Sequence, residues 1–150
     1  GLIFRQEFTG REHVAPALKR LVEATGETAS FYVRAGQDRV CLYRENSPNL
    51  LRYHVEEGMR LNLSTGASGM VLRHFTGERV EDLSLFNTNG TVAACGQTVP
   101  DIASVSTPVF SREGDFLGAL TISGLISRFD TEARAAVIPL LEDLAKSLSG

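Results

Sequence analysis

The chain of 150 residues is 43% hydrophobic and 22% charged, which is ordinary for a single globular domain. Its net charge of −3 and its lack of a dense basic run make this chain by itself a poor candidate for binding DNA or RNA, and neither an apolar stretch of about 18 residues nor a signal peptide is recognisable. Its two cysteines, Cys41 and Cys95, are too few for a disulfide framework, so we expect a cytoplasmic protein without a membrane partner.

The first predicted element is a helix over about residues 10–25. Thr9 and Glu12 have the spacing of a capping box, and Gly26 stands where glycine commonly ends a helix. Pro16 falls in the early turns, where proline is tolerated. One helical face is apolar, at Val14, Leu18, Leu21 and Val22. The segment therefore predicts an amphipathic helix.

Three strands are predicted next. The stretch TASFYVRAGQDRVCLYREN alternates in side-chain character on both sides of AGQD, which is typical of a hairpin. Cys41 belongs to the alternation of the second strand and is expected in the core. The following stretch, LLRYHVEEG, predicts a third strand that ends near Gly58, before a short extended segment.

The middle of the chain predicts one short helix and is then hard to assign. STGASGMVLRHFTG indicates a helix that begins at Ser64 or Thr65 and ends before Gly77. FNTNGT is typical of a turn or loop. VAACGQTVP has no clear periodicity, so its structure stays open.

The last third of the chain predicts a hairpin and a helix. DIASVSTPVFSREGDFLGALTISG indicates two strands joined by REGD. FDTEARAAVIPLLEDLAKSLSG indicates a helix capped by Asp130, and because Pro139 lies inside it we expect a kink or break near Val137 and Ile138. Its apolar stripe consists of Val137, Leu140, Leu141, Leu144 and Leu148.

The order of these elements predicts an α+β fold. Hairpins form antiparallel sheets, and the apolar faces of the first and last helices both need a surface to cover. We therefore expect these two helices on one face of the sheet. The middle helix and the loops are expected on the other face.

The sequence carries no pattern of catalysis or metal binding. His13, His54 and His74 are not spaced with other ligands as they are in metal sites. A nucleophile elbow, a phosphate-binding loop and a dinucleotide fingerprint are all missing. Cys95 is a candidate for thiol chemistry, but its sequence neighbours include no base or cation to activate it. We therefore predict no catalytic residue, no metal and no cofactor.

Small hydroxyl side chains lie along one face of the predicted second hairpin. Ser104 and Ser106 share a face of one strand, and Thr121 and Ser123 share a face of the other. On paired antiparallel strands these faces form one surface. The helix start at TGASG would direct free N–H groups at whatever lies beyond it. This pattern fits a site for a small polar ligand, and hydroxyls that simply face solvent fit it as well.

Several of these stretches resemble the effector-binding domain of IclR-type transcriptional regulators. The most specific is SVSTPVF…G…LGALTISGLISRF, followed by TGETA and by the L-x-L-x-x-x-A-S-G stretch. The resemblance covers about residues 18–149 in the right order.

The resemblance implies a GAF-like fold with a curved antiparallel sheet between helices, and a single effector-binding domain over residues 1–150. It implies that an N-terminal winged helix-turn-helix domain, absent from this chain, would bind operator DNA. Such regulators act as homodimers or homotetramers and as repressors or activators. A small organic or aromatic acid commonly binds the domain and shifts the assembly.

By position in the family, the effector pocket would be lined by Leu50, Tyr53, Leu61, Ala67, Ser68, Ser104, Thr121 and Ser123. Ala94 and Cys95 would be further wall residues, and they replace an acidic pair that is common in the family. The resemblance therefore implies a less negative wall, and it does not identify the effector. The stretch between Gly77 and Gly90 is also shorter than is usual in the family.

Two other functions stay open on the sequence. The domain could be a dimerisation or interaction module whose pocket is filled by its own side chains. Much less in keeping with the sequence is a thiol redox enzyme that uses Cys95, a chemistry that GAF-like folds can host. A cavity under Ala67 and the alkylation rate of Cys95 separate these functions from an effector sensor.

Overall fold

The structure, a computed structural model, describes residues 10–149 except Tyr53 and Val55. In chain order the elements are α2 (Arg11–Thr25), β1 (Thr28–Ala35), β2 (Asp38–Glu45), β3 (Arg60–Asn62), α3 (Gly66–Phe75), the 3₁₀ turn η1 (Leu83–Leu85), β4 (Val92–Cys95), β5 (Ile102–Phe110), β6 (Phe116–Leu125) and α4 (Thr131–Ser147).

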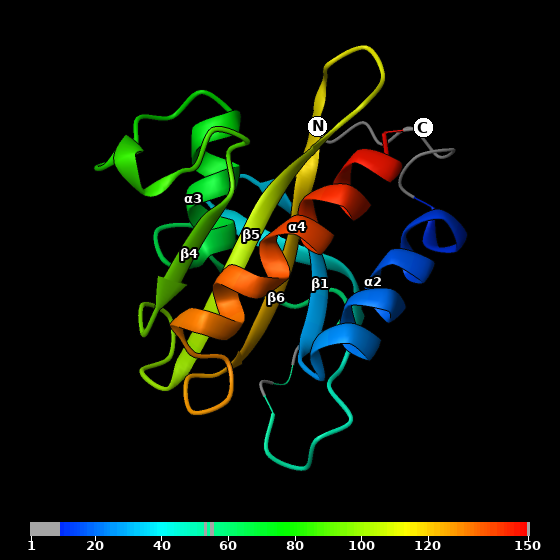
Figure 1. The fold of residues 1–150 in the computed structure, drawn as a ribbon. Coiled ribbons are helices and arrows are strands. Elements are labelled where there is room, and N and C mark those ends of the chain that lie inside the picture. The colour runs from blue at the N-terminus through cyan, green and yellow to red at the C-terminus, as the bar shows by residue number, and fades with distance from the viewer. Residues whose placement is uncertain (1–9, 53, 55, 150) are drawn as a thin grey trace.

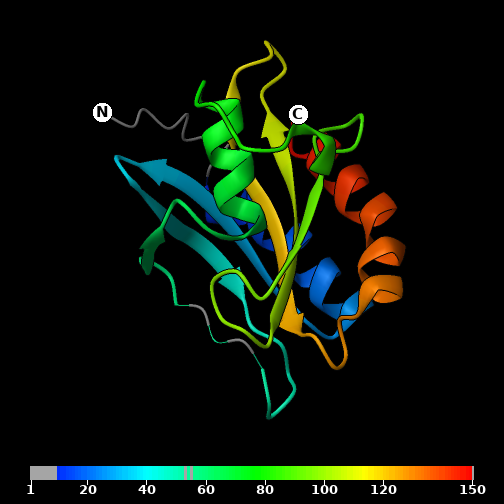
Figure 2. The same ribbon diagram turned by 90° about the vertical axis from the view of Figure 1, so that its left-hand side faces the viewer.

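The strands form one antiparallel sheet in the order β3-β2-β1-β6-β5-β4. The sheet curls, with α2 and α4 side by side on one face (Figure 1). The view from the side places α3 on the opposite face (Figure 2). The predicted α+β, GAF-like fold, with the terminal helices on one face and the middle helix on the other, is confirmed.

Two hydrophobic clusters cover the two faces of the sheet. The apolar stripes of α2 and α4 bury Leu18, Leu21 and Leu141 against the first face, together with Phe31 and Ile122 from the strands. Fully burying one leucine of this kind contributes about 1.5–3 kcal/mol. Both predicted stripes therefore have the role that their spacing indicates.

The second cluster lies under α3. It contains Val71 and Leu72 of the helix, and Tyr32, Cys41 and Ala119 of the strands. The prediction that Cys41 lies in the core is confirmed, because its side chain is fully buried. Burial raises the pKa of the Cys41 thiol to about 12. The thiol is therefore uncharged at neutral pH and unreactive.

The first helix begins one residue later than the capping box predicts. Its N-cap is Gly10, which makes no side-chain cap, and Thr9 lies outside the described residues. The prediction that Thr9 caps the helix is wrong. The helix contains Pro16 and ends at Gly26 in the left-handed conformation, with φ of 72°, as predicted.

The last helix is capped as predicted but does not break. The Asp130 carboxylate accepts a hydrogen bond from the Ala133 N–H at 2.9 Å. The helix then runs through Pro139 to Ser147. Both Pro139 and Ala135 are exposed, so water can bond the Ala135 carbonyl that lacks a donor. The predicted break is therefore wrong, and the alternative of a kink near Val137 and Ile138 stays a prediction.

The third strand lies after Gly58 and not before it. The Gly58 N–H donates to the Cys41 carbonyl at 2.7 Å, and the Cys41 N–H donates to the Met59 carbonyl at 3.0 Å. Pairing with β2 therefore begins at the turn itself and continues into β3. The described residues of the stretch before Gly58 form a loop. Over the described ranges, no helix is both long and apolar enough to cross a membrane.

Candidate functional site

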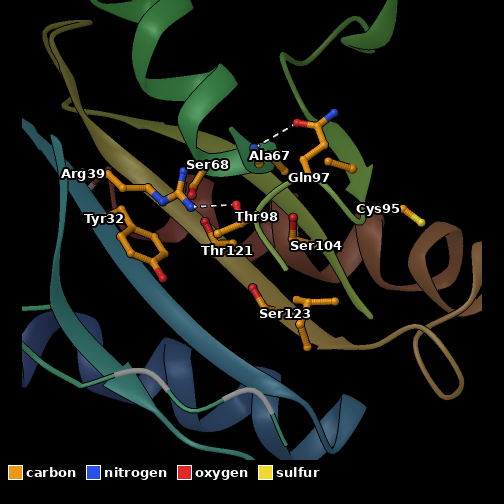
Figure 3. Close-up of a pocket in the computed structure, with 13 residues that line it drawn as sticks. Tyr32, Arg39, Ala67, Ser68, Cys95, Gln97, Thr98, Ser104, Thr121 and Ser123 are labelled. Carbon is orange, nitrogen blue, oxygen red and sulfur yellow. Dashed lines mark hydrogen bonds between the residues drawn. The ribbon is translucent and has the colours of Figure 1, made fainter. Parts of the chain in front are cut away.

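A pocket lies between the sheet and the N-terminal end of α3 (Figure 3). Five residues of the predicted site line it together: Ala67, Ser68, Ser104, Thr121 and Ser123. The two further wall residues, Ala94 and Cys95, line it as well. Residues from β4, β5, β6 and the helix start, which are far apart in the sequence, thus meet at one place.

The floor of the pocket is a set of hydroxyls in register on neighbouring strands. Ser104 pairs with Ser123 across β5 and β6, and Ser106 pairs with Thr121 one row further along. The Ser106 and Thr121 hydroxyls are 2.8 Å apart and buried, so Thr121 already has a partner. Ser104 is half-buried and faces the pocket. Ser104 and Ser123 are therefore the hydroxyls best placed to meet a ligand.

The first turn of α3 forms the opposite wall. Thr65 is the N-cap in an extended conformation, and Gly66 follows at φ of 83°, which only glycine adopts readily. The N–H groups of a helix's first turn have no partner within the helix and point out of its end. The positive end of the helix dipole lies at the same place, so this wall favours an anion.

A buried arginine, Arg39 of β2, lies beneath this turn of the helix. Its side chain is 3% exposed, and its guanidinium donates to the carbonyls of Asn62 and Thr65 and to the Thr98 hydroxyl, the last at 3.1 Å. The close approach depends on Gly69. A Cβ there would lie 2.5 Å from the Leu63 carbonyl oxygen and 3.0 Å from the Arg39 Nη1.

The guanidinium and the helix start have the same polarity. The three acceptors that hold Arg39 in this way, two carbonyls and a hydroxyl, are neutral. A positive charge beside the positive end of a helix dipole raises the local potential, which a bound anion would lower. Donors and positive charge therefore lie at the Arg39 and helix-start side of the pocket.

The remaining wall consists of β4 and the loop that follows it. Ala94 pairs with Ser104, which brings β4 to the pocket edge. Cys95 is exposed, and Figure 3 shows its sulfur pointing away from the labelled hydroxyls. In the loop, the Gln97 Oε1 accepts from the Gly66 N–H at 2.9 Å. The cavity left inside is about 30 Å³, which is room for about one water molecule.

Two predicted site residues that the structure describes, Leu50 and Leu61, are not among the lining residues. Leu50 is fully exposed in the loop after β2, so it does not line the pocket. Leu61 is half-buried on β3 and packs in the cluster under α3. Both residues were placed at the pocket by their position in the family. Tyr53 lies outside the described residues.

Sequence reasoning missed Arg39, Gln97 and Thr98. A signal for Arg39 was present, since it lies two residues before Cys41 and two residues along a strand is the same face. A charged residue on the same strand face as a predicted core cysteine is expected to be buried and therefore to need hydrogen-bond partners. Gln97 and Thr98 carry no such signal, because only the loop's path brings them to Gly66. No group of three metal-ligating side chains occurs in the part of the chain that the structure describes.

The loop before β4 is tied to α4 by one carboxylate. Glu142 accepts from the Thr91 hydroxyl at 2.5 Å and from the side-chain amides of Asn87 and Asn89 at 2.9 and 3.0 Å. Burial raises the pKa of Glu142, but these hydrogen bonds outweigh it and the pKa is lowered. A lowered pKa contributes stability above the ordinary glutamate pKa, which is lost as pH falls through the lowered value.

We expect Glu142→Gln to lower the free energy of unfolding by about 1–2 kcal/mol at neutral pH, because an amide cannot accept all of these bonds. The difference from wild type should shrink as the pH falls through the lowered Glu142 pKa, because the carboxylate is then protonated. Urea titrations at a series of pH values from neutral downward measure it. The exposed neighbour Asp143→Asn should change stability by less than about 0.5 kcal/mol. A Glu142→Gln deficit that persists unchanged in acid would show that the charge is not its cause.

Comparisons with known proteins agree with this fold. Residues 80–150 match the family described as bacterial transcriptional regulator IclR C-terminal. The chain is 23% identical over 159 residues to the HTH-type transcriptional repressor AllR of Klebsiella pneumoniae, covering 89% of this chain and 58% of that protein. The chain therefore spans little more than half the length of this curated relative.

Solved structures show the same fold. A Rhodococcus protein described as an IclR-family regulator superposes with a TM-score of 0.80 at 23% identity, over 92% of this chain and 62% of its own. The inducer-binding domain of the PobR transcription factor from Acinetobacter, a double mutant in complex with 3-hydroxybenzoic acid, superposes with a TM-score of 0.78 at 17% identity. That match covers 93% of this chain and 97% of the PobR domain.

Proposed function

We propose that this chain is the effector-binding domain of a transcriptional regulator, because residues 80–150 match the IclR C-terminal family and the described chain has the fold of a solved IclR-family regulator. An N-terminal winged helix-turn-helix domain outside this chain would bind operator DNA in the cytoplasm. The net charge of −3 is in keeping with a domain that does not itself contact DNA.

The effector that this site fits is a small organic acid. One observation carries the proposal: donors converge on the pocket from three sides. They are the N–H groups at the start of α3, the guanidinium of Arg39, and the hydroxyls of Ser104 and Ser123. Hydrogen bonds to a charged ligand contribute about 1.5–3 kcal/mol each, so several of them support micromolar affinity after the costs of binding.

The signal to DNA would pass through a dimer or tetramer of the regulator. A ligand shifts an equilibrium only by as much as it binds one state better than the other. The acid would therefore bind one quaternary arrangement better and change operator affinity in that way.

A thermal-shift panel of carboxylic acids, each paired with its primary amide, tests the proposal. Acetate, pyruvate, succinate, benzoate and 3-hydroxybenzoate cover increasing size. An acid at about 100 times its Kd should add roughly 2.7 kcal/mol of stability, and its neutral amide much less. Equal responses to acids and amides would contradict a site built for anions.

Ser104→Ala and Ser123→Ala are each expected to weaken binding of the best acid by about 10- to 150-fold, because each removes one hydrogen bond to a charged ligand. Calorimetric titration of each variant measures the loss. Ser147→Ala on α4 is the control and should leave affinity unchanged. Thr121→Val is a less clean probe, because it also removes the partner of Ser106. Unchanged affinity in both pocket serine variants would place the ligand elsewhere.

A second candidate function is an interaction module with a closed pocket. The small cavity volume of about 30 Å³ favours it, since no acid of several carbon atoms fits without movement. This function predicts that no member of the panel changes thermal stability. A thiol redox enzyme is disfavoured because a curated relative is a transcriptional repressor. That function would predict fast alkylation of Cys95 at neutral pH.

A further inference from the structure

The loop between β4 and β5 places its own side chain at the position that suits an anion. The Gln97 Oε1 accepts from the Gly66 N–H at 2.9 Å, at the N-terminal end of α3. We propose that Gln97 is an internal competitor of the effector: its amide oxygen occupies the site of a carboxylate oxygen, and an acid must displace it to bind. This inference rests on the proposed function. Competition by Gln97 would set the effector concentration at which the sensor responds.

The next residue, Thr98, occupies a second donor of the pocket in the same way. The Thr98 hydroxyl accepts from the Arg39 guanidinium at 3.1 Å (Figure 3). It also lies 3.0 Å from the Thr65 hydroxyl. Gln97 and Thr98 together thus use the two strongest anion donors of the pocket, an N–H at the helix start and the buried arginine. A ligand carboxylate has two oxygens to take over both positions.

The loop is suited to give way. Gln97 and Thr98 are both exposed residues, so their bonds to the pocket lie at its mouth and not at its floor. The loop is closed by two backbone hydrogen bonds, from the Gly96 N–H to the Ile102 carbonyl and from the Ile102 N–H to the Val99 carbonyl, and neither involves Gln97 or Thr98. A carboxylate forms stronger hydrogen bonds than a neutral amide or hydroxyl at the same donors. An acid can therefore replace these side chains, and the small cavity is the consequence of their occupying the site.

Competition lowers apparent affinity by the fraction of molecules in which the site is free. Gln97→Ala removes one neutral hydrogen bond from the closed form, so it should tighten anion binding by about three- to tenfold. Gln97→Glu places a permanent carboxylate at the helix start. It should weaken anion binding by more than about tenfold and at the same time raise Tm, since the negative charge suits the helix dipole and Arg39.

Acetate is the probe, titrated against sodium chloride at equal ionic strength, with the Gly66 amide observed by ¹⁵N NMR in this chain. Gln37→Ala is the matched control, because Gln37 is an exposed glutamine in the β1–β2 turn. Tm is measured for all variants without acetate. The expected order of acetate affinity is Gln97→Ala, then wild type with Gln37→Ala, then Gln97→Glu.

The outcomes separate this inference from the proposed function. Suppose that acetate shifts the NMR signal of the Gly66 amide in both wild type and Gln97→Ala, and that the two acetate affinities agree within twofold. Gln97 is then not a competitor, although the anion site stands. The same holds if Gln97→Glu leaves both acetate affinity and Tm at wild-type values. If acetate shifts Gly66 in no variant, the anion site itself is wrong, and the proposed function fails with the competitor.

Discussion

Arg39→Met is expected to weaken binding of the best acid by about 10- to 150-fold and to lower the free energy of unfolding by about 2–4 kcal/mol. Binding falls because the pocket loses its fixed positive charge. Stability falls because the carbonyls of Asn62 and Thr65 lose the guanidinium of a buried arginine as their donor, although methionine keeps much of the apolar stem. Calorimetry and urea titration measure the two effects separately.

Arg34→Met is the matched control for this prediction. Arg34 lies opposite Arg39 on β1 and contacts the other end of α3, through Thr76 and Glu78. Its loss should lower stability but leave acid affinity unchanged. Arg39→Lys should keep part of the affinity, since it keeps the charge without the planar fork of donors. Acid affinity in Arg39→Met within threefold of wild type would place the carboxylate away from this side chain.

Arg128→Met is expected to lower the free energy of unfolding by about 2–4 kcal/mol. Arg128 donates to both carboxylate oxygens of Glu27, at 3.1 and 3.2 Å, and the Glu27 side chain is only 5% exposed. Removing the arginine leaves a buried charge without these two donors. The expected loss of stability is smaller than for a fully buried pair because the Arg128 side chain is 33% exposed.

The pair of Arg60 and Asp38 isolates the effect of burial. It has the same closest N···O distance of 3.1 Å, but its side chains are 57% and 42% exposed. Arg60→Met should therefore change stability by only about 0–1 kcal/mol. The double variant Glu27→Met with Arg128→Met should recover most of the loss, since it removes both charges. Similar losses in Arg60→Met and Arg128→Met would contradict the assignment to burial.

Local patterns predicted most of the elements because each depends on residues close in sequence. Both apolar stripes, the two hairpins, the end of α2 at Gly26 and the cap at Asp130 are set by spacing within a few residues. The wrong or missing predictions concern segments whose structure depends on pairing with another strand. LLRYHVEEG alternates like a strand, but the partner edge of β2 is met only from Gly58 onward. VAAC has little pattern, and β4 forms because β5 offers it an edge.

The site was predictable where strand register carries it. Ser104 and Ser123 face each other because hairpin pairing and a period of two residues place them so. Leu50 was assigned by position in a family and lies in a loop, exposed. Gln97 and Thr98 reach the helix start through an irregular loop, for which no periodicity exists.

The fold class, the two covered faces of the sheet and the row of hydroxyls were predictable from the residues, because they follow from local hydrogen bonding and side-chain periodicity. The position of Arg39 under the start of α3, the hydrogen bond from the Gly66 N–H to Gln97 and the small volume of the cavity are set by the packing of distant segments. These features depend on contacts between residues 23 or more positions apart, as from Arg39 to Asn62, and chain folding alone sets such distances. The polarity of the pocket, and with it the class of effector, follows from those contacts.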